Sequence, residues 1–123
     1  MIVSQTAPEH LALTQYFINE NPTSITISRR AKEPTGSGGW RYGEATDLDP
    51  FVGRLVGSFR LRDSIVRTTE AGQEVIPTHT LIAMPGEDIA RGDQFTVDDV
   101  LYEVVAFNTM PKWRINAEVL AHG

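Results

Sequence analysis

The sequence contains no cysteine among its 123 residues. A disulfide framework and a thiolate metal site are therefore excluded, and the composition fits a reducing compartment. No run of apolar residues approaches the length of about 18 that a membrane-spanning helix needs, and the start, MIVSQTAPEH, lacks the charged region and long apolar core of a signal peptide. We expect a protein without a membrane partner that works inside a cell or in a particle assembled there.

Lysine is also scarce, with two residues against nine arginines, and the net charge is -5. A duplex-DNA-binding domain usually presents a basic face, so this balance argues against one. Arginine suits paired, fork-shaped contacts with carboxylates on a partner. The run Arg29-Arg30-Ala31-Lys32 is a basic patch, and it is either a solvated surface or a contact with an acidic neighbour in an oligomer.

The length and a hydrophobic content of 41% predict one globular domain over residues 1–123. Within it, residues 1–22 form an N-terminal helical segment, with the helix at about 7–20. Thr6 and Glu9 have the spacing of a capping box, Pro8 falls in the first turn, and Asn21-Pro22 ends the helix. Three apolar residues share one helical face: Leu13, Tyr16 and Phe17.

Residues 23–123 show strand patterns with short connections. We predict strands at 23–29, around Tyr42 and Ala45, and at 51–61, 64–69, 74–84, 94–97, 100–107 and 113–121. Residues 70–73 form a hairpin tip, and Asp98-Asp99 form a two-residue turn because aspartate tolerates positive φ better than most residues. Six to eight short strands with tight turns favour a small barrel or sandwich.

The stretch EPTGSGGW, residues 33–40, could be a phosphate-binding loop, a linker or a hairpin tip. A P-loop requires a lysine after its second glycine and a following helix, and neither is present here. Gly36-Ser37-Gly38 also lacks the G-x-S-x-G frame of a nucleophile elbow. With strand patterns on both sides, the stretch is best interpreted as a mobile hairpin tip.

No catalytic or metal-binding set is apparent. His10, His79 and His122 are isolated in sequence, and the aspartates at 88, 93, 98 and 99 lack the spacing of a calcium loop and resemble turn residues. We therefore expect neither an enzyme nor a cofactor, and a hydrolase or metal enzyme is the weakest alternative. Two Trp-Arg pairs, Trp40-Arg41 and Trp113-Arg114, leave a second alternative: a small barrel that binds single-stranded nucleic acid by stacking. The other interpretation makes each tryptophan a core or interface anchor.

Two segments carry a resemblance to a known family. TSITISRRAKEPTGSGGWRYGEA, residues 23–45, resembles the opening strand, Gly-Gly hairpin and aromatic return strand of phage head-closure (stopper, head completion) proteins. GDQFTVDDVLYEVVAFNTMPKWRINAEVLA, residues 92–121, is similar to the hairpin and closing strand with which that family ends. Asp99 departs from the pattern, since relatives often have glycine there, and residues 57–80 depart from it as well.

The resemblance implies a mainly β fold: a small antiparallel β-barrel with one short N-terminal helix and long projecting loops. It implies a structural virion protein, assembled in the host cytoplasm, that forms a ring, a hexamer rather than a dodecamer, between the portal or adaptor protein and the tail terminator or tail completion protein. The ring would close the DNA-filled head and let packaged DNA pass through its channel.

The same interpretation assigns two groups of site residues. The hairpin is the candidate inter-subunit loop: Arg29, Arg30, Lys32, Gly36, Ser37, Gly38, Gly39 and Trp40. In the family, a loop after the strand that corresponds to residues 51–56 reaches into the channel, which by order along the chain falls within residues 57–74. The candidate channel loop therefore includes Arg60, Arg62, Asp63, Arg67, Glu70 and Gln73.

Overall fold

The computed structural model describes residues 3–57, 66–109 and 112–122. These residues form one helix and ten strands in the described ranges: α1 (Val3–Glu20), β1 (Thr23–Ile25), β2 (Ser28–Pro34), β3 (Trp40–Asp47), β4 (Phe51–Gly57), β5 (Arg67–Thr68), β6 (Glu74–Val75), β7 (His79–Ala83), β8 (Gln94–Val97), β9 (Val100–Asn108) and β10 (Ile115–His122). The prediction of a mainly β fold with one N-terminal helix is confirmed. None of the helical residues described is part of a helix with both the length and the apolar character to cross a membrane.

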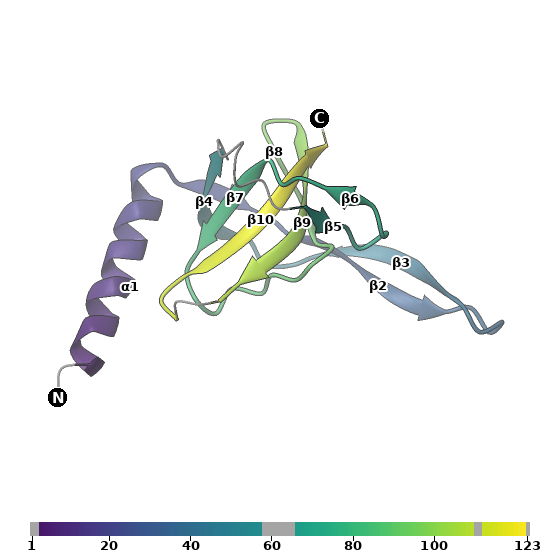
Figure 1. The fold of residues 1–123 in the computed structure, drawn as a ribbon, viewed down its shortest axis with the longest axis horizontal. Coiled ribbons are helices and arrows are strands. Elements are labelled where there is room, and N and C mark those ends of the chain that lie inside the picture. Colours follow the sequence, from purple (N-terminus) through teal and green to yellow (C-terminus); the bar gives the residue numbers. More distant parts are fainter. Residues whose placement is uncertain (1–2, 58–65, 110–111, 123) are drawn as a thin grey trace.

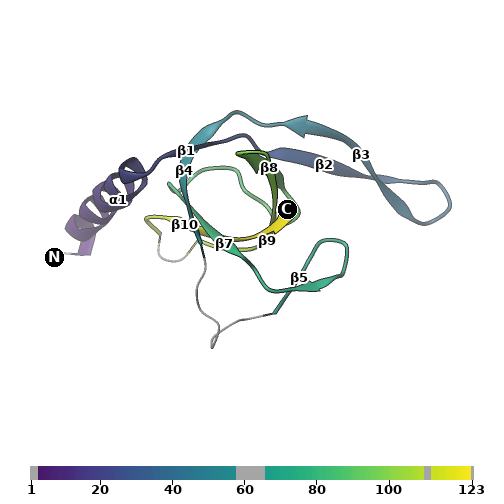
Figure 2. The same ribbon diagram turned by 90° about the horizontal axis from the view of Figure 1, so that it is seen from above.

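Eight strands form one curled antiparallel sheet in the order β1-β4-β7-β10-β9-β8-β2-β3. At one side β1 pairs with β4, through Thr23 and Gly53, and at the other β2 pairs with β8, through Ser28 and Gln94. Only two residues, 26 and 27, separate β1 from β2, so one bent segment joins the two sides and the sheet curls into a small barrel (Figure 2). This architecture matches the predicted β-barrel.

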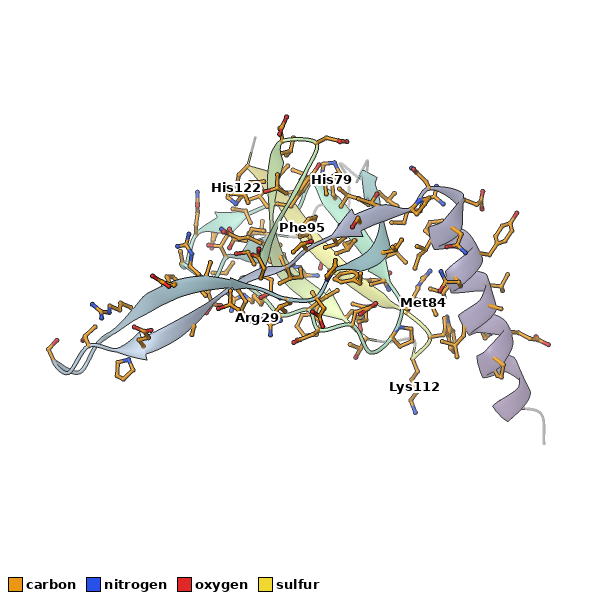
Figure 3. The ribbon with its side chains drawn as sticks, turned by 180° about the vertical axis from the view of Figure 1, so that it is seen from behind. Arg29, His79, Met84, Phe95, Lys112 and His122 are labelled. Atoms are coloured by element: carbon orange, nitrogen blue, oxygen red, sulfur yellow. The ribbon has the colours of Figure 1, made fainter. Side chains whose placement is uncertain are left out.

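The core of the barrel is made of inward-facing residues from most of its strands. Ile25 and Ile27 have no exposed surface and lie on one face, as their alternation predicts. Phe95, seen within the barrel in Figure 3, stacks on Tyr102 with ring centroids 5.3 Å apart. The other buried members are Phe51, Leu81, Ala83, Ile89, Val104, Ile115, Ala117 and Val119.

Helix α1 differs from the prediction at its start. It begins at Val3 rather than near residue 7, so Pro8 lies inside the helix and the predicted capping box is not its first turn. The helix does end at Glu20, before Asn21-Pro22. Ile18 and Thr14 are buried, since α1 packs on β4 and β7, whereas Leu13 and Tyr16 on the adjoining face are exposed.

Several strand boundaries also differ. The predicted strand at 23–29 is divided between β1 and β2, and the one at 74–84 is interrupted between β6 and β7. The hairpin tip at 70–73 is confirmed, with Thr69 N donating to the carbonyl of Gln73 over 2.8 Å, although β5 and β6 have only two residues each. The turn at Asp98 and Asp99 is confirmed by φ angles of 50° and 65°.

The β2–β3 hairpin, residues 28–47, leaves the barrel as a long two-stranded arm (Figures 1 and 2). We call it the arm. From Arg30 onward β2 is exposed, and β3 is the last strand of the sheet, so its outer edge has no neighbour within the described residues. The arm and α1 lie at opposite ends of the long axis of the molecule (Figure 1).

Candidate functional site

Arg29 anchors the base of the arm to the barrel, at the position labelled in Figure 3. Its Nε and Nη2 donate to the two carboxylate oxygens of Asp93, each over 2.8 Å, and its Nη1 and Nη2 donate to the carboxylate of Asp88 over 3.2 and 3.0 Å. The hydrogen bonds to Asp93, followed by those to Asp88, raise the pKa of Arg29 above its ordinary value. Arg29 is therefore a structural ion-pair residue rather than a cation available for docking.

Asp93 is oriented for this contact by its own turn. Its side chain is only 2% exposed, and one carboxylate oxygen accepts a hydrogen bond from the backbone N–H of Ala90 over 2.7 Å. Gly92, with a φ of 92°, provides the preceding turn, and the Asp93 carbonyl accepts from Val104 N over 2.8 Å. The prediction of turn residues thus fits Asp93, which also holds the arginine.

A second ion-pair group joins the two sets of residues that the sequence analysis selected. Lys32 Nζ of the arm lies 2.6 Å from Glu70 Oε1 in the β5–β6 turn, and Arg91 Nη1 lies 3.8 Å from Glu70 Oε2. Arg91 also donates to the backbone carbonyls of Thr68 and Thr69 over 2.6 and 2.9 Å. Glu70 therefore faces the base of the arm.

A pocket of about 240 Å³ lies between the arm and this turn. Its lining places cations and carboxylates side by side: Arg29, Arg30, Lys32 and Arg91 with Glu70, Asp93 and Glu103. Because most of these cations already bind carboxylates, the pocket has little excess positive charge for a phosphate. Among the described residues, no group of three or more histidine or acidic side chains is placed to hold a metal.

The outer half of the arm is open to solvent. The tip is closed by a hydrogen bond from Thr35 N to the carbonyl of Gly39 over 3.1 Å, and Gly36 and Gly38 have φ angles of 80° and 90°. Ser37 is exposed, and its hydroxyl lies 3.1 Å from that of Thr35. EPTGSGGW is thus a hairpin tip, as predicted.

The remaining predicted arm residues lie along its two strands. The guanidinium of Arg30 lies over the ring of Tyr42, 6.0 Å from its centroid. Trp40 begins β3 and pairs in register with Pro34. Arg41 Nε lies 3.7 Å from Glu33 Oε2 on the opposite strand. The arm thus has some support from cross-strand contacts, although no core lies beneath it.

The candidate channel group is only partly described. Arg67 Nη2 binds Glu118 Oε2 of β10 over 2.7 Å, and Gln73 closes the β5–β6 turn through its backbone. Arg67 therefore attaches the short hairpin to the barrel, and Glu70, held by Lys32, attaches it to the arm. Arg60, Arg62 and Asp63 lie outside the described residues.

The four residues proposed for nucleic-acid stacking do not share a surface. Trp113 stacks on His10 of α1, with ring centroids 4.1 Å apart and an interplanar angle of 16°. Trp40 and Arg41 begin β3 at the far end of the arm, across the molecule from α1 (Figure 1). The tryptophan next to Arg114 is therefore an anchor between the helix and the barrel.

No local pattern in the sequence connects Arg29 with Asp93, or Lys32 with Glu70 and Arg91. These contacts join residues 64, 38 and 21 positions apart, and no short motif encodes such separations. An arginine-rich run in a chain with many aspartates at turns indicates that ion pairs form, but it does not identify which residues are the partners.

Neither a model of any protein family nor any curated protein sequence matches this chain.

Proposed function

We propose that the chain is a structural subunit of a tailed-phage neck. It forms a ring, a hexamer rather than a dodecamer, between the portal or adaptor protein and the tail completion protein, and the ring closes the DNA-filled head. The proposal joins the resemblance of residues 23–45 and 92–121 to head-closure proteins with a barrel, helix and projecting hairpin arranged in the order that the resemblance implies.

The arm is the observation that carries the proposal. A two-stranded ribbon is only marginally stable alone in water, and this one extends from the barrel with its outer residues exposed. Such an element suits a subunit whose arm becomes ordered against a neighbour. In a ring of identical subunits, each contact joins two unlike surfaces, so one projecting element per subunit is sufficient.

The contacts of the arm base support the same function. Arg29 with Asp93, and Lys32 with Glu70, fix where the arm leaves the barrel, while the glycine-rich tip stays free to adapt. A fixed base and an adaptable tip suit docking between subunits, for which no catalytic group is needed. The channel segment would then fall within residues 57–74, a range that includes β5, which Arg67 attaches to the barrel, and the turn at 70–73.

An electron microscopy map of assembled particles tests this function. We expect six copies of the curled barrel in a ring between portal and tail, and a monomer or weak oligomer for the isolated protein in light scattering. A tight dimer in solution, together with a neck that lacks this chain, would refute the proposal.

A further inference from the structure

The outer edge of β3 has no neighbouring strand within the described residues, because β3 is the last strand of the eight-stranded sheet. The strand is eight residues long, and residues 41, 42 and 44–47 are exposed. It runs along the outside of the projecting arm (Figure 2). A long exposed edge is a template for pairing with another chain, and a two-stranded ribbon gains stability from a further strand. The edge of β3 is therefore a candidate interaction surface.

The pairing of β3 with β2 shows which backbone groups of β3 face this edge. Near the tip, Thr35 N donates to the Gly39 carbonyl, and near the barrel Leu48 N donates to the Ile27 carbonyl. Opposed residues in an antiparallel pair alternate between hydrogen-bonded and non-hydrogen-bonded pairs. Counted from these two bonds, the backbone groups that point away from β2 belong to four residues: Trp40, Tyr42, Ala45 and Asp47.

Two other features agree with this count. Pro34, which has no N–H, lies opposite Trp40 in a pair whose backbone groups point away from each other, so the missing donor costs no bond within the arm. Ser28 lies opposite Asp47, and its backbone groups point away from β3, toward Gln94 of β8, with which it pairs. The directions of the backbone groups are thus consistent from the barrel to the tip.

A β-bulge gives the outward-pointing residues of β3 a symmetric spacing. Gly43 and Glu44 together lie opposite Ala31, because the register shifts between Arg30 and Lys32. The outward-pointing residues are therefore separated by two, three and two positions, from 40 to 42, from 42 to 45 and from 45 to 47. This spacing is the same in both directions along the strand.

A second copy of β3, running antiparallel, matches this spacing. Trp40 then lies opposite Asp47 of the other copy, and Tyr42 lies opposite Ala45 of the other copy, so outward-pointing groups meet on both sides of the bulge. A shift of the register by one or two residues breaks this match. A regular strand has outward-pointing groups at every second residue and cannot match both sides of the bulge.

The side chains are compatible with this pairing as well. Arg41 lies opposite Thr46 of the other copy and diagonal to its Glu44, a distance that long side chains can span. Within the described part of the chain Glu44 has no ion pair, and Arg41 has only the 3.7 Å contact with Glu33 while 72% exposed. Two Arg41–Glu44 contacts, related by the twofold axis, can therefore form, and no like charges lie opposite each other.

We propose that β3 pairs with β3 of a second copy of this chain, antiparallel and about a twofold axis through the bulge, so that the two arms form one continuous sheet. Each chain contributes a single strand, so the dimer is weak and forms only at high concentration. The proposal goes beyond the neck ring and does not rest on it, because ring contacts join unlike surfaces and this contact joins like ones.

Single cysteines test the register, since the chain has no cysteine of its own. Arg41→Cys and Thr46→Cys of two chains lie opposite each other in a non-hydrogen-bonded pair, with Cα atoms about 4.5 Å apart, which suits a disulfide. Full-length chains with one cysteine each and different size tags are mixed at high concentration with oxidised glutathione. We expect the mixed disulfide as the main product. Either variant alone should give little dimer, because like positions lie about 17 Å apart along the strands.

The matched control is Ala45→Cys mixed with Arg41→Cys. Ala45 is exposed and adjacent to Thr46, but it lies on the opposite face of the arm, so the yield of mixed disulfide should be low. Equal yields from the two mixtures, or a main product from either variant alone, would overturn the proposed register.

Ala45→Pro separates edge pairing from folding of the arm. The substitution removes an N–H that points away from β2, so the contacts between β2 and β3 remain while the outer edge loses a donor. In sedimentation velocity, we expect the wild type to shift toward a dimer as its concentration rises, and the variant to stay monomeric with an unchanged melting temperature. A wild type that stays monomeric, or a folded variant that dimerises equally, would refute the proposal. If the variant melts earlier, the cysteine pair decides the question.

Discussion

Lys32 on β2 and Glu70 in the β5–β6 turn form an ion pair, with 2.6 Å between Lys32 Nζ and Glu70 Oε1. This contact joins two hairpins that the barrel topology alone would leave independent, since β5 and β6 form a separate two-stranded sheet. The direction in which the arm projects is therefore set partly by a residue 38 positions further along the chain.

Glu70→Gln tests this relationship. The pair is partly exposed, so its loss should lower the free energy of unfolding by less than about 1 kcal/mol. The amides of the arm near Lys32 should nevertheless exchange with deuterium faster, since one of the contacts that hold the arm is gone. Glu44→Gln, on the exposed β3 strand, is the matched control. Unchanged exchange in the Glu70 variant would mean that the ion pair does not restrain the arm.

Arg29→Ala should destabilise the barrel itself. The substitution leaves the Asp93 carboxylate buried with only the Ala90 N–H as its described side-chain partner, and breaking such a pair costs about 3 kcal/mol. Arg30→Ala, next in sequence and stacked on Tyr42 at 6.0 Å, should change stability by less than about 0.5 kcal/mol. Urea denaturation of both variants measures the difference. Equal values would show that Arg29 contributes no more than a surface residue.

The pH dependence of the contact between Arg29 and Asp93 follows from the direction in which the pKa of Arg29 is shifted. Because the folded-state pKa of Arg29 is raised, its stabilisation is complete below the ordinary arginine pKa and is lost only when the pH passes through the raised value. The stability difference between the wild type and Arg29→Ala should therefore stay constant from neutral pH to about pH 10. A stability difference that shrinks between neutral pH and about pH 10 would contradict the raised pKa of Arg29.

Gly53→Ala should destabilise through steric overlap. A Cβ at this position in β4 would lie 2.8 Å from the carbonyl oxygen of Ile82 and 3.0 Å from Leu81 Cδ1, on the neighbouring strand. Neither backbone nor buried leucine can move freely, so we expect a loss of about 1–3 kcal/mol. At Gly43 the added Cβ meets only the end of the Glu33 side chain, which can rotate away. A thermal melt of Gly53→Ala that matches that of Gly43→Ala would disprove this packing argument.

Deleting Gly36 to Gly39 shortens the arm where it touches nothing else within the described residues. A Cβ built on Gly36 or Gly38 would meet no atom within 4 Å, so the monomer should keep its melting temperature and circular dichroism spectrum. Neck assembly should be impaired, as measured by the yield of tailed particles in a complementation assay. Normal assembly with the shortened arm would refute the role of the tip in subunit docking.

Local chemistry made much of the fold predictable. The Asp98-Asp99 turn, the end of α1 before Asn21-Pro22 and the glycine-rich hairpin tip each follow from backbone preferences of a few adjacent residues. The shared face of Ile25 and Ile27 follows from the two-residue period of a strand. Such features depend on neighbours in the chain, so a single sequence suffices to find them.

Features that depend on tertiary contacts were not predictable in the same way. Pro8 and the Thr6–Glu9 spacing are typical of a helix start and predict one near residue 7, whereas α1 begins at Val3, four residues earlier. Leu13, Tyr16 and Phe17 share one helical face, yet the buried side chains described in α1 are those of Thr14 and Ile18. Which face of the helix is buried depends on how it docks on β4 and β7, and helical spacing alone does not determine that docking.

The segment that closes the barrel is also one side of the arm. β1 pairs with β4, and two residues later the same segment pairs with β8 and continues into the projecting hairpin. A pull on the arm is therefore transmitted along a continuous backbone to the seam where the sheet closes. A force on the arm would therefore act on this seam. Arg29, which binds Asp93, follows Ser28, the residue of β2 that pairs with β8, so it lies where the arm leaves the barrel. Tension from a neighbouring subunit would load the barrel at its point of closure.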